Sequence, residues 1–213
     1  VVPFSRHASS PGIGDHRHRP YSPWQPALAE FRMGGTGLSG LALSQDRGGL
    51  PAPWDEAFVV ANPIVNAVQA VAVDRAADPY RLERLPDLLT TADTWFRPVA
   101  VHFGPDGCLY VVDWYNEIIS HNEVSRSDPR RDKERSRVWR VRHESQTSRT
   151  PPDLTRVATA ELVGRLDADS TWESRAAWHQ IADRGAVELA PELRALARDR
   201  SRRAEARLLA SWS

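Results

Sequence analysis

The chain has 213 residues, 41% of them hydrophobic, which is enough for one or two domains with a packed core. Its 28 Lys and Arg residues balance its 28 Asp and Glu residues, so it lacks the overall positive charge of a protein that binds nucleic acid or anionic membranes. The single cysteine excludes a disulfide framework and a cysteine-based zinc site, and no apolar stretch is long enough to span a membrane.

Residues 1–33 are rich in Pro, Gly, His and Arg and have no regular period. We expect an irregular loop here, or the remnant of a repeat unit that precedes the next segment. His16 and His18 stand two residues apart, directly after Asp15. They are either part of a metal site or, because no third ligand is in register, part of an exposed polar loop.

Residues 34–145 show the two-residue alternation and the turn residues that are typical of antiparallel strands. The pattern of residues 39–62 recurs at residues 99–113, where the sequence GPDG at 104–107 predicts a tight turn. A repeat of about fifty to sixty residues is in the range of four-stranded propeller blades. We therefore predict a β-propeller fragment of about two antiparallel blades, with the first segment as a loop or the remnant of a preceding blade.

Residues 114–136 separate the second strand of this repeat from the next predicted strand, Arg137–His143, and they show no periodicity. Loops of this length inside a compact domain are usually functional or disordered. This loop carries aromatic side chains and the apolar pair Ile118 and Ile119. We therefore expect it to be ordered.

Residues 146–155 form a Ser, Thr and Pro-rich linker, after which the composition shifts to Ala, Leu, Arg and Glu with a helical period. Residues 156–213 are predicted to form short antiparallel helices that begin at the caps Thr159, Thr171 and Ser201. Such helices suit a helical repeat array. Because the chain begins with Val and stops inside a helical pattern, we expect it to be a fragment.

The sequence FRPVAVHFGPDGCLYVVDWYNEIISH, followed by DPRRD and RVWRV, resembles the β-propeller of the membrane-bound dehydrogenases of planctomycetes and related bacteria. That propeller is similar to the glucose/sorbosone dehydrogenase propellers, which use pyrroloquinoline quinone. The sequence ELVGRLDADSTWESRAAWHQIADRG resembles the HEAT-type repeats that follow the propeller in this family. The resemblance covers residues 34–213 and implies a β-propeller fragment followed by an all-α segment of HEAT-like helical repeats. It departs from the family at residues 133–136, where KERS replaces a motif with two histidines.

The resemblance implies an exported or periplasmic dehydrogenase that oxidises a sugar or alcohol. Its implied cofactors are pyrroloquinoline quinone and Ca²⁺, with a cytochrome c as electron acceptor and haem c only if a downstream module follows. No nucleic-acid partner is expected. The alternative is a non-catalytic scaffold of propeller and helical solenoid that binds a glycan or a protein.

Six residues around the strand end near residue 113 carry the implied site. The catalytic groups are His121 and Arg97, and the cofactor-binding groups are Asp113, Asn116, Tyr115 and Arg131. Of these, Asp113 and Asn116 are oxygen donors of the kind that Ca²⁺ prefers. Arg131 is also placed to join a local ion-pair network with Asp128, Arg130 and Asp132.

Each of these roles has a structural alternative. Arg97 binds a carboxylate or a quinone oxygen, or it pairs with Asp93 or Asp113. Asp113 and Asn116 bind Ca²⁺, or they cap backbone groups at the strand end. His121 is a general base or a structural hydrogen-bond donor. Since antiparallel pairing places Asp113 beside Arg97, we expect these two residues to converge with Asn116 and His121 on a common ligand.

Overall fold

The computed structural model of the chain describes residues 33–34, 37–78, 80–119 and 123–213. These residues divide into two compact units, and neither unit is continuous in sequence. The strand unit contains the described residues up to 44 together with 52–102 and 110–140. The helix unit contains residues 45–51, 103–109 and 141–213.

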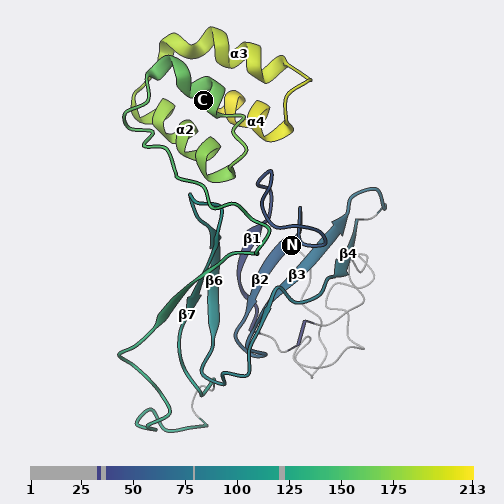
Figure 1. The fold of residues 1–213 in the computed structure, drawn as a ribbon, viewed down its shortest axis with the longest axis vertical. Helices are drawn as coiled ribbons and strands as arrows, with labels where there is room; N and C mark the ends of the chain where they lie inside the picture. Colours follow the sequence, from purple (N-terminus) through teal and green to yellow (C-terminus); the bar gives the residue numbers. More distant parts are fainter. Residues whose placement is uncertain (1–32, 35–36, 79, 120–122) are drawn as a thin grey trace, which may run out of the picture. The chain divides into compact units, whose positions relative to one another are not determined.

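The first sheet of the strand unit is an antiparallel meander with the strand order β1-β2-β3-β4 (Figure 1). A short strand, β5, pairs with the beginning of β3. The central strands β2 and β3 supply the core of this sheet, because Val59, Ala61, Val68 and Ala70 are fully buried. The five strands are β1 (Ser39–Leu43), β2 (Phe58–Asn62), β3 (Ala67–Asp74), β4 (Arg81–Arg84) and β5 (Leu89–Thr90).

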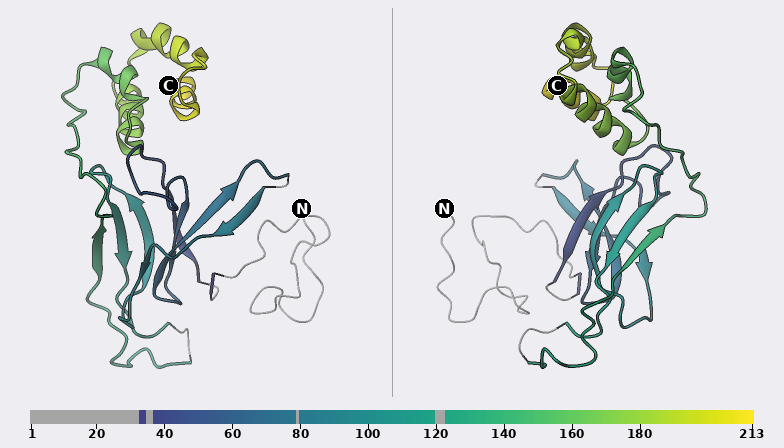
Figure 2. Two further views of the ribbon diagram at one scale, coloured as in Figure 1. Left: turned by 45° about the vertical axis from the view of Figure 1, so that its right-hand side comes forward. Right: turned by 90° about the vertical axis from the view of Figure 1, so that its left-hand side faces the viewer.

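The second sheet has three strands in the order β6-β7-β8, which run side by side in Figure 2. They are β6 (Pro98–Phe103), β7 (Leu109–Asp113) and β8 (Arg137–Val141). Every second residue of β7 is buried, with Leu109, Val111 and Asp113 on one face and the more exposed Val112 on the other. This alternation gives the sheet one inner face and one outer face, and it leaves β8 as an edge strand.

The two sheets of the strand unit meet where β1 passes β6. The Ser39 hydroxyl donates a hydrogen bond of 2.7 Å to the carbonyl of Val99. A side chain at Gly40 would place its Cβ only 2.7 Å from the Cα of Ala100, and Gly40 has a φ of +65°. Only glycine fits both the close approach and the left-handed backbone at this position. The register of β1 on β2 shifts at the same point, between Ser39 and Leu41.

The helix unit contains four α-helices and two 3₁₀ turns in its described residues, which enclose a shared apolar core. Leu162, Leu166, Ile181 and Leu193 are among the buried members of this core. No helix in the described part of the chain is both long enough and apolar enough to cross a membrane. The elements are η1 (Thr159–Glu161), α1 (Leu162–Arg165), α2 (Thr171–Asp183), η2 (Val187–Leu189), α3 (Ala190–Arg198) and α4 (Ala204–Trp212).

All three predicted helix caps differ in the structure. Thr159 is the first residue of η1, whose N-cap is Ala158. The N-cap of α2 is Ser170, whose hydroxyl accepts a hydrogen bond from the backbone of Glu173, so the helix begins one residue earlier than predicted. Ser201 does not cap α4, because its hydroxyl donates to the carboxylate of Asp199 instead. Short polar side chains make local hydrogen bonds of several kinds, and the sequence alone does not select one of them.

The prediction of a β-propeller fragment followed by HEAT-like repeats is wrong. The described strands form one sheet of five strands and one of three, not a repeated blade of four. The helices have only 4, 13, 9 and 9 residues, and no HEAT-like repeat is evident among the described residues. The apparent repeat was the ordinary alternation of antiparallel strands, which does not determine how the strands are divided between sheets.

Candidate functional site

The carboxylate of Asp113, at the end of β7, is the centre of a buried polar cluster. Asp113 is fully buried. Its Oδ1 accepts hydrogen bonds from the backbone N–H of Arg97 (2.8 Å) and of Tyr115 (2.9 Å). Its Oδ2 accepts from Arg137 Nε (2.6 Å) and Trp139 Nε1 (2.9 Å). These four donors occupy the lone-pair directions of both oxygens and offset the cost of burying the charge.

The guanidinium of Arg97 is likewise held by hydrogen bonds to other parts of the protein. It donates to the backbone carbonyls of Asn116 (2.7 Å), Pro63 (2.8 Å) and Glu117 (2.7 Å). Burial lowers the pKa of Arg97, and the carboxylates of Glu117 and Asp113 oppose this effect. Because an arginine stays protonated even so, Arg97 acts as a buried cation that ties the beginning of β6 to two loops.

Asn116 orders the beginning of the long loop. Its backbone N–H donates to the carbonyl of Trp95, and its side-chain Nδ2 donates to the carbonyl of Asp132, both at 3.0 Å. Its Oδ1 accepts from the backbone of Ile118 at 3.3 Å. The bond to Asp132 joins the two ends of the loop, which fits the expectation that the described part of this loop is ordered.

Arg137, the first residue of β8, links the cluster to its surface. Its Nη2 lies 2.8 Å from Asp93 Oδ2, while its Nε donates to Asp113. Its guanidinium carbon lies 4.3 Å from the centre of the Tyr115 ring and 5.1 Å from that of Trp139. Burial would lower the pKa of Arg137, but the hydrogen bonds to Asp93 and Asp113 outweigh it and raise this pKa.

Asp93 completes the cluster on the solvent side. The backbone N–H of Trp95 and the guanidinium of Arg137 hold the pKa of the Asp93 carboxyl below its ordinary value of 3.8, although burial acts in the opposite direction. The rings of Trp95 and Tyr115 stack at 5.1 Å, and Arg135 lies 5.7 Å from the centre of the Tyr115 ring. Aromatic rings therefore surround the charged groups of the cluster.

Arg131 lies apart from this cluster. It donates to the backbone carbonyls of Ser125 and Val124, both at 3.1 Å, and so ties together its own loop. The neighbouring ion pair is formed by Asp128 and Arg130, with two contacts of 3.0 Å. The hydrogen bonds from Arg130 lower the pKa of Asp128 to about 2.

The structure brings together four of the predicted site residues, Arg97, Asp113, Tyr115 and Asn116. Their polar groups face one another or the backbone. His121 lies outside the described residues, as do His16 and His18.

The arrangement of these residues does not fit a calcium ion. N–H donors point at both oxygens of Asp113, and Asn116 Oδ1 also accepts an N–H, so a cation would meet hydrogen atoms rather than lone pairs. No group of three or more His, Cys, Asp or Glu able to hold a metal occurs in the described part of the chain. A carboxylate of pyrroloquinoline quinone would also find each of the three guanidinium nitrogens of Arg97 already donating to a backbone carbonyl.

Sequence reasoning missed Arg137 and Trp139 as members of the cluster. They stand two residues apart on β8, so their side chains share the face that carries Asp113. The sequence did contain one signal for this contact: Arg137 lies in a predicted strand, and a charged residue whose side chain faces the inside of a sheet needs a partner there.

Apolar side chains are exposed around β8. Val112 on the outer face of β7 and Trp114, directly after that strand, are 36% and 42% exposed. On β8, Val138 (65% exposed) faces the same side as Val112, whereas its neighbour Trp139 (43% exposed) faces the side that carries Asp113. We call these four residues the edge surface. Single exposed apolar residues are common, but a group of them at the edge of a sheet is typical of a binding site.

Comparisons with known proteins add one finding. Residues 20–145, more than half of the chain, match a family described as a domain of unknown function, DUF7133. The matched range includes β1 to β8 and the whole polar cluster. No curated protein and no solved structure gives a significant match.

Proposed function

Since the chain belongs to the family of the domain of unknown function DUF7133, we propose its function from geometry: it is a non-catalytic unit that binds an extended segment of a partner protein along β8. The observation that carries this proposal is the edge surface itself. β8 is an outer strand of its sheet, and Val138, its second residue, is 65% exposed.

The backbone of β8 suits the addition of a strand. Within the described chain, β7 is the only strand that pairs with β8, so β8 is an edge strand, the kind of strand to which an extended partner segment can be added. Protected edge strands often carry Pro, charged side chains or a bulge; β8 has no Pro, and of its two arginines Arg137 is bonded to Asp113. Among the other outer strands, β1 is bulged and hydrogen-bonds to β6, which makes these two strands poorer templates. The outer strand β4 is short and has charged residues at three of its four positions.

The buried cluster supports this function by holding β8 in place. Asp113 on β7 binds both Arg137 and Trp139 on β8, so two side-chain contacts add to the backbone ladder. A strand that is already ordered loses less conformational entropy when a partner pairs with it. The polar residues that suggested catalysis are therefore explained as a rigid support for a binding strand.

The composition of the edge surface favours a protein over a glycan. Val112 and Val138 expose aliphatic side chains on one face of this edge, and apolar groups of this kind are typical of the centre of a protein interface. The expected partner segment is extended and carries apolar side chains at every second position, because side chains of a strand alternate between its faces.

Synthetic peptides test this proposal. A peptide of alternating Val and Thr should bind the chain and slow the hydrogen exchange of the β8 amides, whereas the same peptide interrupted by Pro should not. Val138→Lys should weaken binding at least about tenfold. Leu41→Lys is the matched control on β1, where Leu41 is 61% exposed, and it should leave binding unchanged.

Equal binding to the wild type and Val138→Lys would refute the proposal. Protection of β8 by oligosaccharides in place of peptides would support the glycan alternative.

The dehydrogenase function implied by the sequence resemblance stays a prediction. Its proposed base, His121, lies outside the described residues. Dye reduction with sugars in the presence of pyrroloquinoline quinone and Ca²⁺ tests it. If the wild type reduced the dye and the His121→Ala variant did not, the dehydrogenase function would take the place of the binding function proposed here.

A further inference from the structure

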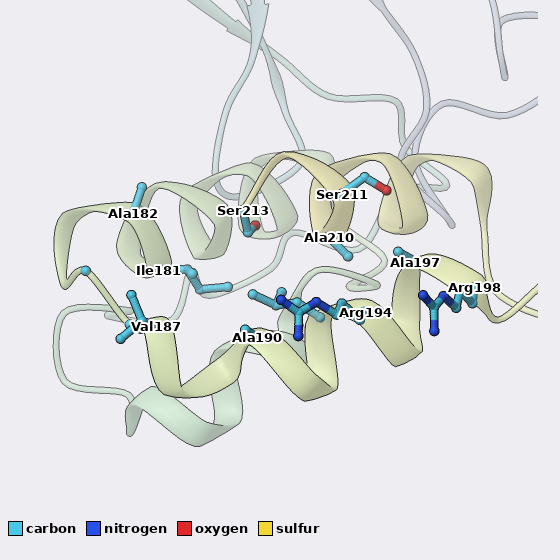
Figure 3. Close-up of a pocket in the computed structure, with 13 residues that line it drawn as sticks. Ile181, Ala182, Val187, Ala190, Arg194, Ala197, Arg198, Ala210, Ser211 and Ser213 are labelled. Atoms are coloured by element: carbon cyan, nitrogen blue, oxygen red, sulfur yellow. The ribbon is translucent and has the colours of Figure 1, made fainter.

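The helix unit contains a second candidate site, which is independent of β8. A groove of about 550 Å³ lies among α2, α3 and α4. Apolar side chains from three helices line it, with Ile181 from α2, Leu193 from α3 and Ala210 from α4, beside arginine and serine side chains. Figure 3 shows Arg194 and Arg198 along the α3 side of this groove.

Arg194 and Arg198 differ from most other arginines of the helix unit. Arg165 pairs with Glu173 at 2.6 Å, and Arg203 pairs with Asp167 at 2.9 Å. Within the described residues, Arg194 and Arg198 have neither a carboxylate nor a hydrogen-bond acceptor in contact. They stand four residues apart on α3, so their guanidinium groups project from the same side of the helix.

The apolar side chains and the two arginines together indicate which class of ligand would fit the groove. Small-molecule sites are usually apolar clefts of about 300–1,000 Å³ with a few polar groups that fix orientation. Two neighbouring guanidinium groups match a carboxylate, which accepts charge-assisted hydrogen bonds from both. The apolar wall matches a hydrocarbon body, because burying it removes apolar surface from water.

We propose that this groove binds a small amphiphilic carboxylate. The apolar tail lies on Ile181 and Leu193, and the carboxylate lies between Arg194 and Arg198. Ser211 on α4 and Ser213, directly after α4, also line the groove. Their hydroxyls donate to the carbonyls of Arg207 and Leu209, which leaves their lone pairs able to accept.

Decanoate is a suitable probe, with 1-decanol as its uncharged analogue. Titration of the whole chain with decanoate should shift the NMR methyl signals of Ile181 and Leu193 in a saturable manner. Decanol should bind at least about tenfold more weakly, since it offers no anion to the arginines. The double variant Arg194→Gln/Arg198→Gln should lose about tenfold in decanoate affinity and bind decanol unchanged.

The matched control is Arg175→Gln, an exposed arginine on α2 that does not line the groove. It should bind decanoate as the wild type does. Ala182→Phe changes an exposed residue of the groove and should block both ligands by filling the space.

Equal affinity of the wild type and the double variant for decanoate would overturn the proposal. So would decanol binding as tightly as decanoate, or the absence of saturable shifts. An acidic amphipathic peptide that binds where decanoate does not would mark the groove as a protein-docking site and would also overturn it.

Discussion

Asp113 is a fully buried carboxylate that accepts hydrogen bonds from two backbone amides and two side chains. Every donor that satisfies it also excludes a cation from the same lone pair. In a sequence, Asp at a strand end beside Trp, Tyr and Asn indicates chemistry. In the folded chain, the same residue holds β8 against β7, because Arg137 Nε and Trp139 Nε1 both donate to its Oδ2.

Asp113→Asn tests this structural role. The amide keeps the shape of the side chain but turns one acceptor into a donor that faces other donors, and it removes the charge beside Arg137. We expect the free energy of unfolding of the strand unit to fall by about 3 kcal/mol. Urea titration measures it. Asp128→Asn, in the exposed pair with Arg130, is the control and should change nothing measurable. If both variants behaved alike, Asp113 would not anchor β8.

At the scale of elements, local patterns predicted the strands well. The alternation in PVAVHF and CLYVVD predicted β6 and β7, and RVWRV predicted β8. The division into sheets of five and three strands was not predicted, since alternation is the same in every antiparallel sheet with one buried face.

The predicted hairpin correctly placed Arg97 beside Asp113. The other partners of Asp113 were not foreseen. Arg137 and Trp139 follow it by 24 and 26 residues, across a loop without periodicity, and no local pattern contains such a contact.

Gly40→Ala tests the junction between β1 and β6. The alanine Cβ would meet the Ala100 backbone at 2.7 Å, and the φ of +65° disfavours any L side chain. We expect a loss of about 3 kcal/mol in the free energy of unfolding of the strand unit. Gly164→Ala in α1 is the control, because a Cβ there meets nothing within 4 Å and alanine favours a helix. Thermal unfolding measures the midpoint temperature of each variant. Equal midpoints for Gly40→Ala and Gly164→Ala would contradict the prediction.

At the scale of the whole molecule, the two units interleave along the chain. Residues 45–51 precede β2 in sequence but belong to the helix unit. Asp46 shows why, because its carboxylate accepts hydrogen bonds from the backbone and the hydroxyl of Thr171 at the beginning of α2 and pairs with Arg149. A boundary placed by composition alone cannot assign such a segment, since the contact joins residues 125 positions apart.

The importance of this long-range cap can be measured with Asp46→Ala. The side chain of Asp46 is buried, and its loss removes the acceptor of the Thr171 N–H at the beginning of α2 and the carboxylate partner of Arg149. We expect the helix unit to lose about 2 kcal/mol, which combines a lost cap with a broken, partly shielded ion pair. Hydrogen exchange of the α2 amides in the intact chain reports this unit separately from the strands. Asp183→Ala removes an exposed carboxylate from the last turn of the same helix and should not speed exchange, because a negative charge there opposes the helix dipole. Unchanged exchange in Asp46→Ala would mean that α2 is held by Ser170 and the apolar core alone, and that residues 45–51 only lie against it.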